Sequence, residues 1–197
     1  NNPKNISNSL LREILTKFKI KNKKINIFND IPYGSGLGSS SSITVSLTKA
    51  FNILKNINLS KSNLAETSFL IEEKVSGSTI GKQDHFMSTF GGINRFTYKS
   101  DRTTVKKLIF DKKSIDEIQS FFLLIKVGSQ RKAYDLLYEQ KNNLLSDLKK
   151  KESMIELVSM VPMVEKALYN FEFKELGSYL KRSWQFKRSR NFYSQSN

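Results

Sequence analysis

The sequence predicts an α+β fold with a mixed first part and a helical second part. Apolar residues recur at helical spacing through most of the chain, and several short stretches before Gly128 alternate between apolar and polar residues, as strands do. Glycine supports this division, because after Gly128 only Gly177 remains. A chain of 197 residues is long enough for one large domain or two small ones. We expect two domains, residues 1–119 and 120–197.

The elements of the first part follow from periodicity and from glycine stops. Gly77 is expected to end one helix, and Gly91 a shorter one that opens near Gly81. In chain order we expect a helix over residues 10–18, a strand over 24–31, a buried helix over 39–54, a helix over 62–75, a short helix before residue 91, and strands over 93–98, 105–110 and 121–127.

The second part is predicted to consist of three successive helices. They are expected over residues 133–150, 154–169 and 174–188. Pro162 is expected to kink the middle helix, because proline lacks the backbone N–H that a helix interior requires.

Composition restricts the class of protein. The absence of cysteine rules out a disulfide framework and a thiolate metal site, and the lack of a long uncharged apolar run predicts no membrane span. Without an apolar signal core we expect a cytoplasmic location. The net charge of +15 suggests an anionic partner. Because lysine is spread along the chain, we do not expect nucleic acid binding, although a non-catalytic polyanion-binding module is the alternative from another class.

A glycine–serine turn carries the first chemical signal. Gly34, Gly36 and Gly38 follow the predicted strand, and Ser39 and Ser40 open the next helix. Glycines allow close backbone approach, and a helix N-terminus offers unpaired N–H groups and a positive dipole end, which suit a phosphate. The spacing fits neither a P-loop nor a dinucleotide fingerprint. A plain loop that caps a helix is the alternative.

Asp84 carries the second signal. It follows Gly81, Lys82 and Gln83 at the start of the short helix. A carboxylate there could orient a substrate hydroxyl beside a phosphate cradle and a divalent metal, which are the parts that phosphoryl transfer needs. We expect Asp84 within reach of the glycine turn; the alternative is a simple helix cap.

Both motifs resemble those of one enzyme family. Residues 31–41 are similar to the second conserved motif of GHMP kinases, the family of galactokinase, homoserine kinase and mevalonate kinase. Residues 71–85 and 90–94 look like the branch that phosphorylates D-glycero-D-manno-heptose 7-phosphate, except that His85 stands where that branch usually has glutamine. The resemblance covers about residues 10–194. For His85 we expect a packed or solvated side chain.

The resemblance implies an ATP-dependent sugar kinase with Mg²⁺ that acts on the anomeric hydroxyl of a sugar phosphate; a galactose or fucose kinase is the alternative substrate class. It implies Asp84 as the catalytic carboxylate, with Glu73 an alternative to Glu72 at the metal. The implied ATP-binding residues are Pro32, Gly34, Ser35, Gly36, Leu37, Gly38, Ser39 and Ser40. The implied metal ligands are Ser39, Ser40 and Glu72, and the implied substrate contacts are Lys82, Gln83, Asp84, Gly92 and Arg131.

The implied fold has two domains, an N-terminal part like ribosomal protein S5 domain 2 and a helix-rich, ferredoxin-like C-terminal part. The strand pair with which family members begin has no counterpart before Asn1, and their late glycine-rich loop has none before Asn197. The chain therefore resembles an internal fragment, incomplete at both ends, and we expect it to be weakly active or inactive alone. A homodimer is compatible with the resemblance.

Overall fold

The computed structural model describes residues 3–30, 35–77, 80–125 and 148–189. These residues belong to two compact units. The first unit reaches Val105, and the second begins at Lys106 and contains the helices of the C-terminal part. None of the described helices is long and apolar enough to cross a membrane.

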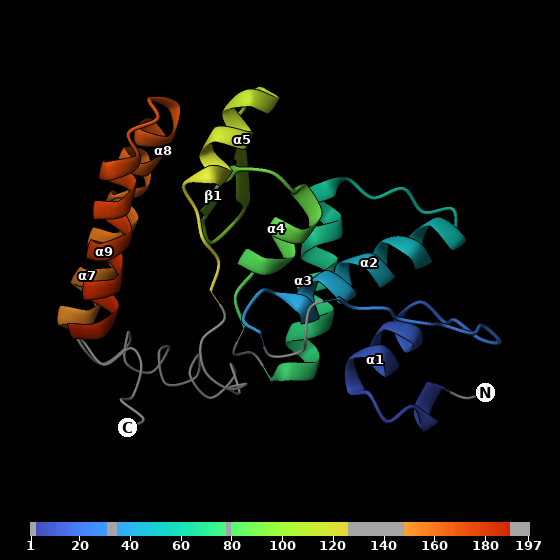
Figure 1. Ribbon diagram of the computed structural model, residues 1–197. Coiled ribbons are helices and arrows are strands. Elements are labelled where there is room, and N and C mark those ends of the chain that lie inside the picture. The colour runs from blue at the N-terminus through green and yellow to red at the C-terminus, as the bar shows by residue number, and fades with distance from the viewer. Residues whose placement is uncertain (1–2, 31–34, 78–79, 126–147, 190–197) are drawn as a thin grey trace. The chain divides into compact units, whose positions relative to one another are not determined.

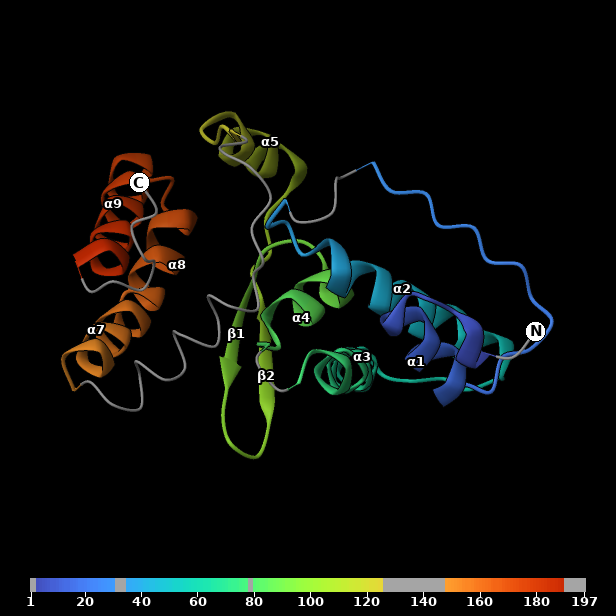
Figure 2. The same cartoon turned by 90° about the horizontal axis from the view of Figure 1, so that it is seen from below.

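The first unit is a helical cluster with one hairpin (Figure 1). Its helices α2, α3 and α4 pack on one another, and α1 packs on α2 and α3. The elements are the 3-10 helix η1 (Pro3–Asn5), α1 (Ser9–Lys17), α2 (Ser39–Leu54), α3 (Lys61–Ser76), α4 (Gln83–Phe90), β1 (Asn94–Tyr98) and β2 (Thr103–Lys107). The two strands form a two-stranded sheet, which Figure 2 shows as a long hairpin. Together these elements confirm the mixed α and β content.

Local capping explains where these helices begin and end. The Asn8 side chain accepts a hydrogen bond from the backbone N–H of Leu11 at 2.9 Å, and the Ser60 side chain accepts one from Asn63 at 3.2 Å. Gly77 ends α3 with a φ of 75°, as predicted, because an L side chain is strained in that left-handed conformation.

Two apolar clusters hold the first unit together. The first joins α1 to α2 and α3 and consists of Ile14, Leu15, Phe18, Ile20, Phe51 and Ile71. The second is aromatic and centres on the fully buried Phe86 of α4, whose ring lies about 6 Å from the rings of Phe90, Phe96 and Tyr98. Burying a side chain of this size contributes roughly 1.5–3 kcal/mol. The aromatic cluster fixes α4 against the hairpin, and α4 carries Asp84.

The predicted strand over residues 24–31 is wrong for the part that the structure describes. Residues 24–30 form no strand, and the chain there runs extended (Figure 2). The Phe28 side chain is 93% exposed. Alternation of apolar residues favours an extended backbone, but a strand also needs a neighbouring edge that pairs with its N–H and C=O groups.

The strands predicted over residues 105–110 and 121–127 are also corrected. The strand predicted over 105–110 corresponds to β2, which ends at Lys107. It is followed by the helix α5 (Lys112–Ser120), which we did not predict. The Asp111 side chain caps α5 by accepting a hydrogen bond from the Ser114 N–H at 2.7 Å. Residues 121–125 form no strand, and all five are exposed. The remaining two residues of that prediction lie outside the described residues.

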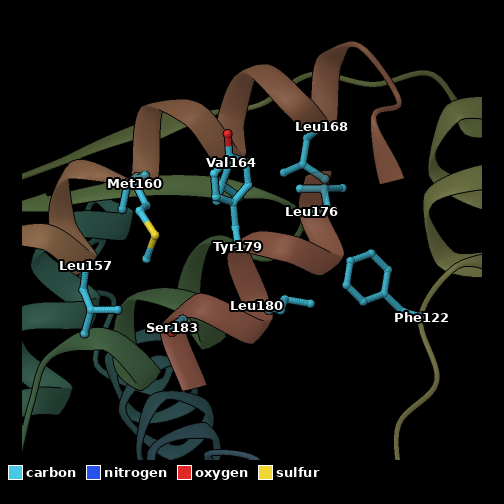
Figure 3. Close-up of a pocket in the computed structure, with 10 residues that line it drawn as sticks. Phe122, Leu157, Met160, Val164, Leu168, Leu176, Tyr179, Leu180 and Ser183 are labelled. Carbon is cyan, nitrogen blue, oxygen red and sulfur yellow. The ribbon is translucent and has the colours of Figure 1, made fainter. Parts of the chain in front are cut away.

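The second unit contains α5, α7 (Leu148–Ser159), α8 (Val161–Tyr169) and α9 (Phe173–Ser189). The helix predicted over 154–169 is two helices, and Pro162 lies in the first turn of α8, where its missing N–H costs no hydrogen bond. Most of the helix predicted over 133–150 lies outside the described residues. Side chains of α7, α8 and α9, together with Phe122, surround an apolar pocket of about 490 Å³ (Figure 3).

Candidate functional site

The glycine–serine turn leads into α2 and leaves the start of that helix open. Gly36 and Gly38 have φ values of 76° and 67°, and Gly38 is the N-cap of α2. The Gly38 carbonyl oxygen accepts the first helical hydrogen bond from the Ser42 N–H at 2.9 Å. Glycine has no side chain to cap the helix, and no side-chain cap is present among the described residues. The N–H groups of the first turn can therefore bind an anion, which the helix dipole also favours.

Hydroxyl groups surround this helix start. The Oγ atom of Ser35 is buried and has no hydrogen-bond partner among the described residues. Ser39 and Ser40 are the first two residues of α2 and are partly buried. A buried hydroxyl without a partner, next to open N–H groups, fits a ligand with several acceptor oxygens. Pro32 and Gly34 lie outside the described residues.

Asp84 lies directly against the turn. A Cβ atom added to Gly38 would lie 3.3 Å from both Cβ and Cγ of Asp84 and 3.4 Å from its Oδ2. The side chain of Asp84 is exposed and projects from the first turn of α4, which packs on α2 and α3. The expectation that Asp84 lies within reach of the glycine turn therefore agrees with the structure.

Glu72 reaches the same helix start from α3. Its side chain is only 4% exposed, and its Oε2 lies 2.8 Å from Nε2 of His85 and 3.3 Å from Oγ1 of Thr44. Burial by itself raises the pKa of Glu72. Hydrogen bonds from His85, Ser40 and Thr44, together with the charge that His85 can carry, outweigh burial and hold the pKa of this carboxyl below its usual 4.5. Glu72 is therefore ionised at neutral pH.

Lys82 is held in a network that the sequence did not suggest. Its Nζ lies 2.9 Å from Oε2 of Glu66 in α3, and its ammonium lies over the ring of Phe69. Thr103 of β2 also donates a hydrogen bond to Glu66, at 3.3 Å. Lys82 is therefore already paired, while about a third of its side chain stays exposed beside Asp84.

Tyr98 belongs to the surroundings of Asp84 and was missed by sequence reasoning. Burial raises the pKa of the Tyr98 phenol to about 12, and the negative charges of Asp84 and Glu66 add to the shift. The side chain is still 44% exposed. The sequence did offer a signal, because Tyr98 stands two positions after Phe96, and residues two apart on a strand share one face. In the structure both rings pack on Phe86.

The structure does not show the other predicted site residues in contact with Asp84 or Glu72. Gln83 opens α4, and its amide points along the helix to Sδ of Met87 at 3.8 Å. Gly92 is exposed with a φ of 72°. Arg131 lies outside the described residues. A hydrogen bond of 3.0 Å between the hydroxyls of Ser42 and Ser88 also joins α2 to α4, and no sequence pattern indicated it.

The oxygen atoms of this site are of the kind that could bind a metal ion. Among the described residues, no group of three or more His, Cys, Asp or Glu side chains is placed to hold an ion by itself. Magnesium usually takes one or two protein oxygens and completes its shell with phosphate and water. The hydroxyl of Ser40 and the carboxylate of Glu72 supply oxygens of that kind and already share a hydrogen bond. These residues fit a magnesium ion that arrives with a nucleotide.

Comparison with known proteins shows which family the first part of the chain resembles. Residues 4–92, which include the glycine turn, Glu72 and Asp84, match the family described as GHMP kinases N terminal domain. Residues 4–92 are therefore similar to a GHMP kinase N-terminal domain, which confirms the resemblance seen in the sequence.

Two sugar kinases are similar to most of this chain. The chain is 31% identical over 165 residues to a D-glycero-alpha-D-manno-heptose 7-phosphate kinase of Campylobacter jejuni, an alignment covering 83% of this chain and 48% of that protein. It is 28% identical over 171 residues to a bifunctional fucokinase/GDP-fucose pyrophosphorylase of Arabidopsis thaliana, covering 82% of this chain and 16% of that protein. The chain thus spans about half the length of the first relative.

Proposed function

We propose that this protein is an ATP-dependent sugar kinase that phosphorylates the anomeric hydroxyl of D-glycero-D-manno-heptose 7-phosphate. The product would be the 1,7-bisphosphate, a precursor of nucleotide-activated heptose for surface polysaccharide. The observation that carries the proposal is the contact of Asp84 with Gly38, because it brings a free carboxylate to an open helix N-terminus. The similarity to a heptose 7-phosphate kinase supports the choice of substrate.

Each part of the site has a role in this proposal. The N–H groups at the start of α2, with Ser35, Ser39 and Ser40, bind phosphate oxygens. Asp84 accepts or orients the proton of the attacking hydroxyl, and Ser40 and Glu72 hold the magnesium. When bound, Mg-ATP supplies the phosphoryl group and neutralises its developing charge. The protein contributes mainly positioning and charge stabilisation.

The substrate side of the site is proposed mainly from residues at the two ends of α4. Lys82, Gln83 and Gly92, together with Arg131, are assigned to the sugar phosphate. An arginine suits this task because its planar fork matches phosphate oxygens. We also propose the two-domain architecture of the family, with residues 1–119 as the ATP-binding domain and 120–197 as part of the second domain, and a cytoplasmic protein.

A substrate panel tests the proposal. The natural polypeptide that contains these residues is incubated with Mg-ATP and heptose 7-phosphate, fucose or galactose, and ADP release is followed. We expect turnover with the heptose phosphate. Reaction with unphosphorylated hexoses alone would instead favour the fucose or galactose type, to which the second relative points. Salt-dependent binding of nucleic acid without ATP binding would favour the polyanion-binding module.

A further inference from the structure

His85 is the one histidine of the chain, and the proposed chemistry leaves it without a task. It follows Asp84 in α4 but points into the unit, where its side chain is 1% exposed. The ring meets Phe69 edge-on, with centroids 5.7 Å apart. A buried polar ring costs free energy unless its nitrogens have partners, so the contacts it does make are informative.

Among the residues that the structure describes, His85 has one hydrogen-bond partner, Glu72. Its Nε2 lies 2.8 Å from Oε2 of Glu72. Because an ionised carboxylate only accepts hydrogen bonds, Nε2 carries the proton and donates. Its Nδ1 is buried without a hydrogen-bond partner among the described residues. The position of the ring is therefore tied to Glu72 by a single polar contact.

Thr44 is a weaker hydrogen-bond donor to that oxygen than His85. Its hydroxyl lies 3.3 Å from Oε2 of Glu72 but 2.9 Å from the carbonyl oxygen of Ser40. A hydroxyl has one proton to donate, and the shorter distance favours the carbonyl. His85 is therefore the main donor to Oε2, while Ser40 bonds the same carboxylate at the start of α2.

We propose that His85 is a positioning residue that holds the Glu72 carboxylate toward Ser40 and thereby sets the magnesium-dependent part of nucleotide affinity. The inference rests on the proposed function, because it assigns Glu72 and Ser40 to the metal of Mg-ATP. Groups that orient a metal ligand from behind typically change metal affinity by about 10- to 100-fold when they are lost.

Three substitutions separate the hydrogen bond from the packing. In His85→Gln the side-chain amide N–H lies about as far from the backbone as Nε2 of histidine, so it can still donate to Glu72. His85→Asn carries its amide only as far as Nδ1 and loses the bond to Glu72, while it stays polar. His85→Leu removes both nitrogens. Thr48→Val is the matched control, since Thr48 is a fully buried residue of α2 whose hydroxyl has no hydrogen-bond partner among the described residues.

The measurement, made on the natural polypeptide that contains these residues, is the dissociation constant of ATP by calorimetry, once with magnesium and once with a chelator. We expect the unaltered chain, His85→Gln and Thr48→Val to gain equally from magnesium. His85→Asn and His85→Leu should lose about tenfold or more of Mg-ATP affinity, with unchanged affinity in the chelator. If His85→Leu does not fold, the inference is tested by comparing how much ATP affinity His85→Asn and His85→Gln each gain from magnesium.

Two results would overturn the inference without contradicting the proposed function. If His85→Asn gains as much from magnesium as His85→Gln, the hydrogen bond does not position Glu72. If affinity falls equally with and without magnesium, His85 has only a structural role. Failure of the unaltered natural polypeptide to bind ATP at all would instead contradict the proposed function itself, so the two failures are distinguishable.

Discussion

Gly38→Ala tests whether the position of the Asp84 carboxylate depends on the absence of a side chain at Gly38. The backbone at Gly38 has a φ of 67°, which costs an alanine about 1–2 kcal/mol. The new Cβ would also lie 3.3 Å from the Asp84 side chain, so one of the two must shift by a few tenths of an ångström. Because Asp84 is exposed, we expect the carboxylate to move and little further stability to be lost.

Gly77→Ala is the matched control. Gly77 has a φ of 75°, and nothing lies within 4 Å of its added Cβ. The strain should therefore equal that of Gly38→Ala without any contact with the site. Since a misplacement of about 1 Å can cost roughly 100-fold in rate, a shift of a few tenths should lower kcat by about three- to tenfold in Gly38→Ala alone.

The assay combines urea unfolding of both variants with ADP release at saturating substrates. Both variants should lose about 1–2 kcal/mol in free energy of unfolding, and only Gly38→Ala should lose activity. Equal loss of kcat in the two variants would show that the effect comes from general strain. Unchanged activity in Gly38→Ala would refute the reasoning that the contact places Asp84.

Two further predictions concern the surroundings of Asp84. The Tyr98 phenol should titrate near pH 12 in a spectrophotometric titration, and Asp84→Asn should lower that pKa because it removes one of the charges that raise it; no change would mean that the two groups do not interact. Since the folded-state pKa is raised, the stability that neutral Tyr98 contributes is present below pH 10 and lost as the pH rises toward 12. Phe86→Ala should lower the free energy of unfolding by about 3–5 kcal/mol in a urea titration, because Phe86 is fully buried in the aromatic cluster; a loss below about 1 kcal/mol would contradict that packing.

The sequence predicted the elements around the site well because their signals are local. The N-terminus of α2 follows from a glycine turn and a serine run, and the end of α3 from Gly77. The closeness of the turn and Asp84 was expected from the parts that phosphoryl transfer needs and from the family resemblance, since spacing alone does not bring α2 and α4 together. The helix α5 had a local signal in Asp111 that we did not use.

What the sequence did not predict depends on contacts between distant segments. Residues 24–30 alternate as a strand does, yet pairing depends on an edge elsewhere in the chain. The link between Lys82 and Glu66, which also includes Thr103 of β2, joins three elements and has no fixed spacing. For His85 we expected a packed or solvated side chain, and the structure shows it packed and buried. Its bond to Glu72 depends on the packing of α4 against α3.

Asp84→Asn measures the central claim most directly. The substitution keeps the shape of the side chain beside Gly38 but removes its charge and its basicity. In the natural polypeptide that contains these residues, we expect Mg-ATP affinity to stay within about twofold while kcat falls by at least about 100-fold, as for loss of a positioned general base. An unchanged kcat would contradict the account, because Asp84 would then have no part in the transfer.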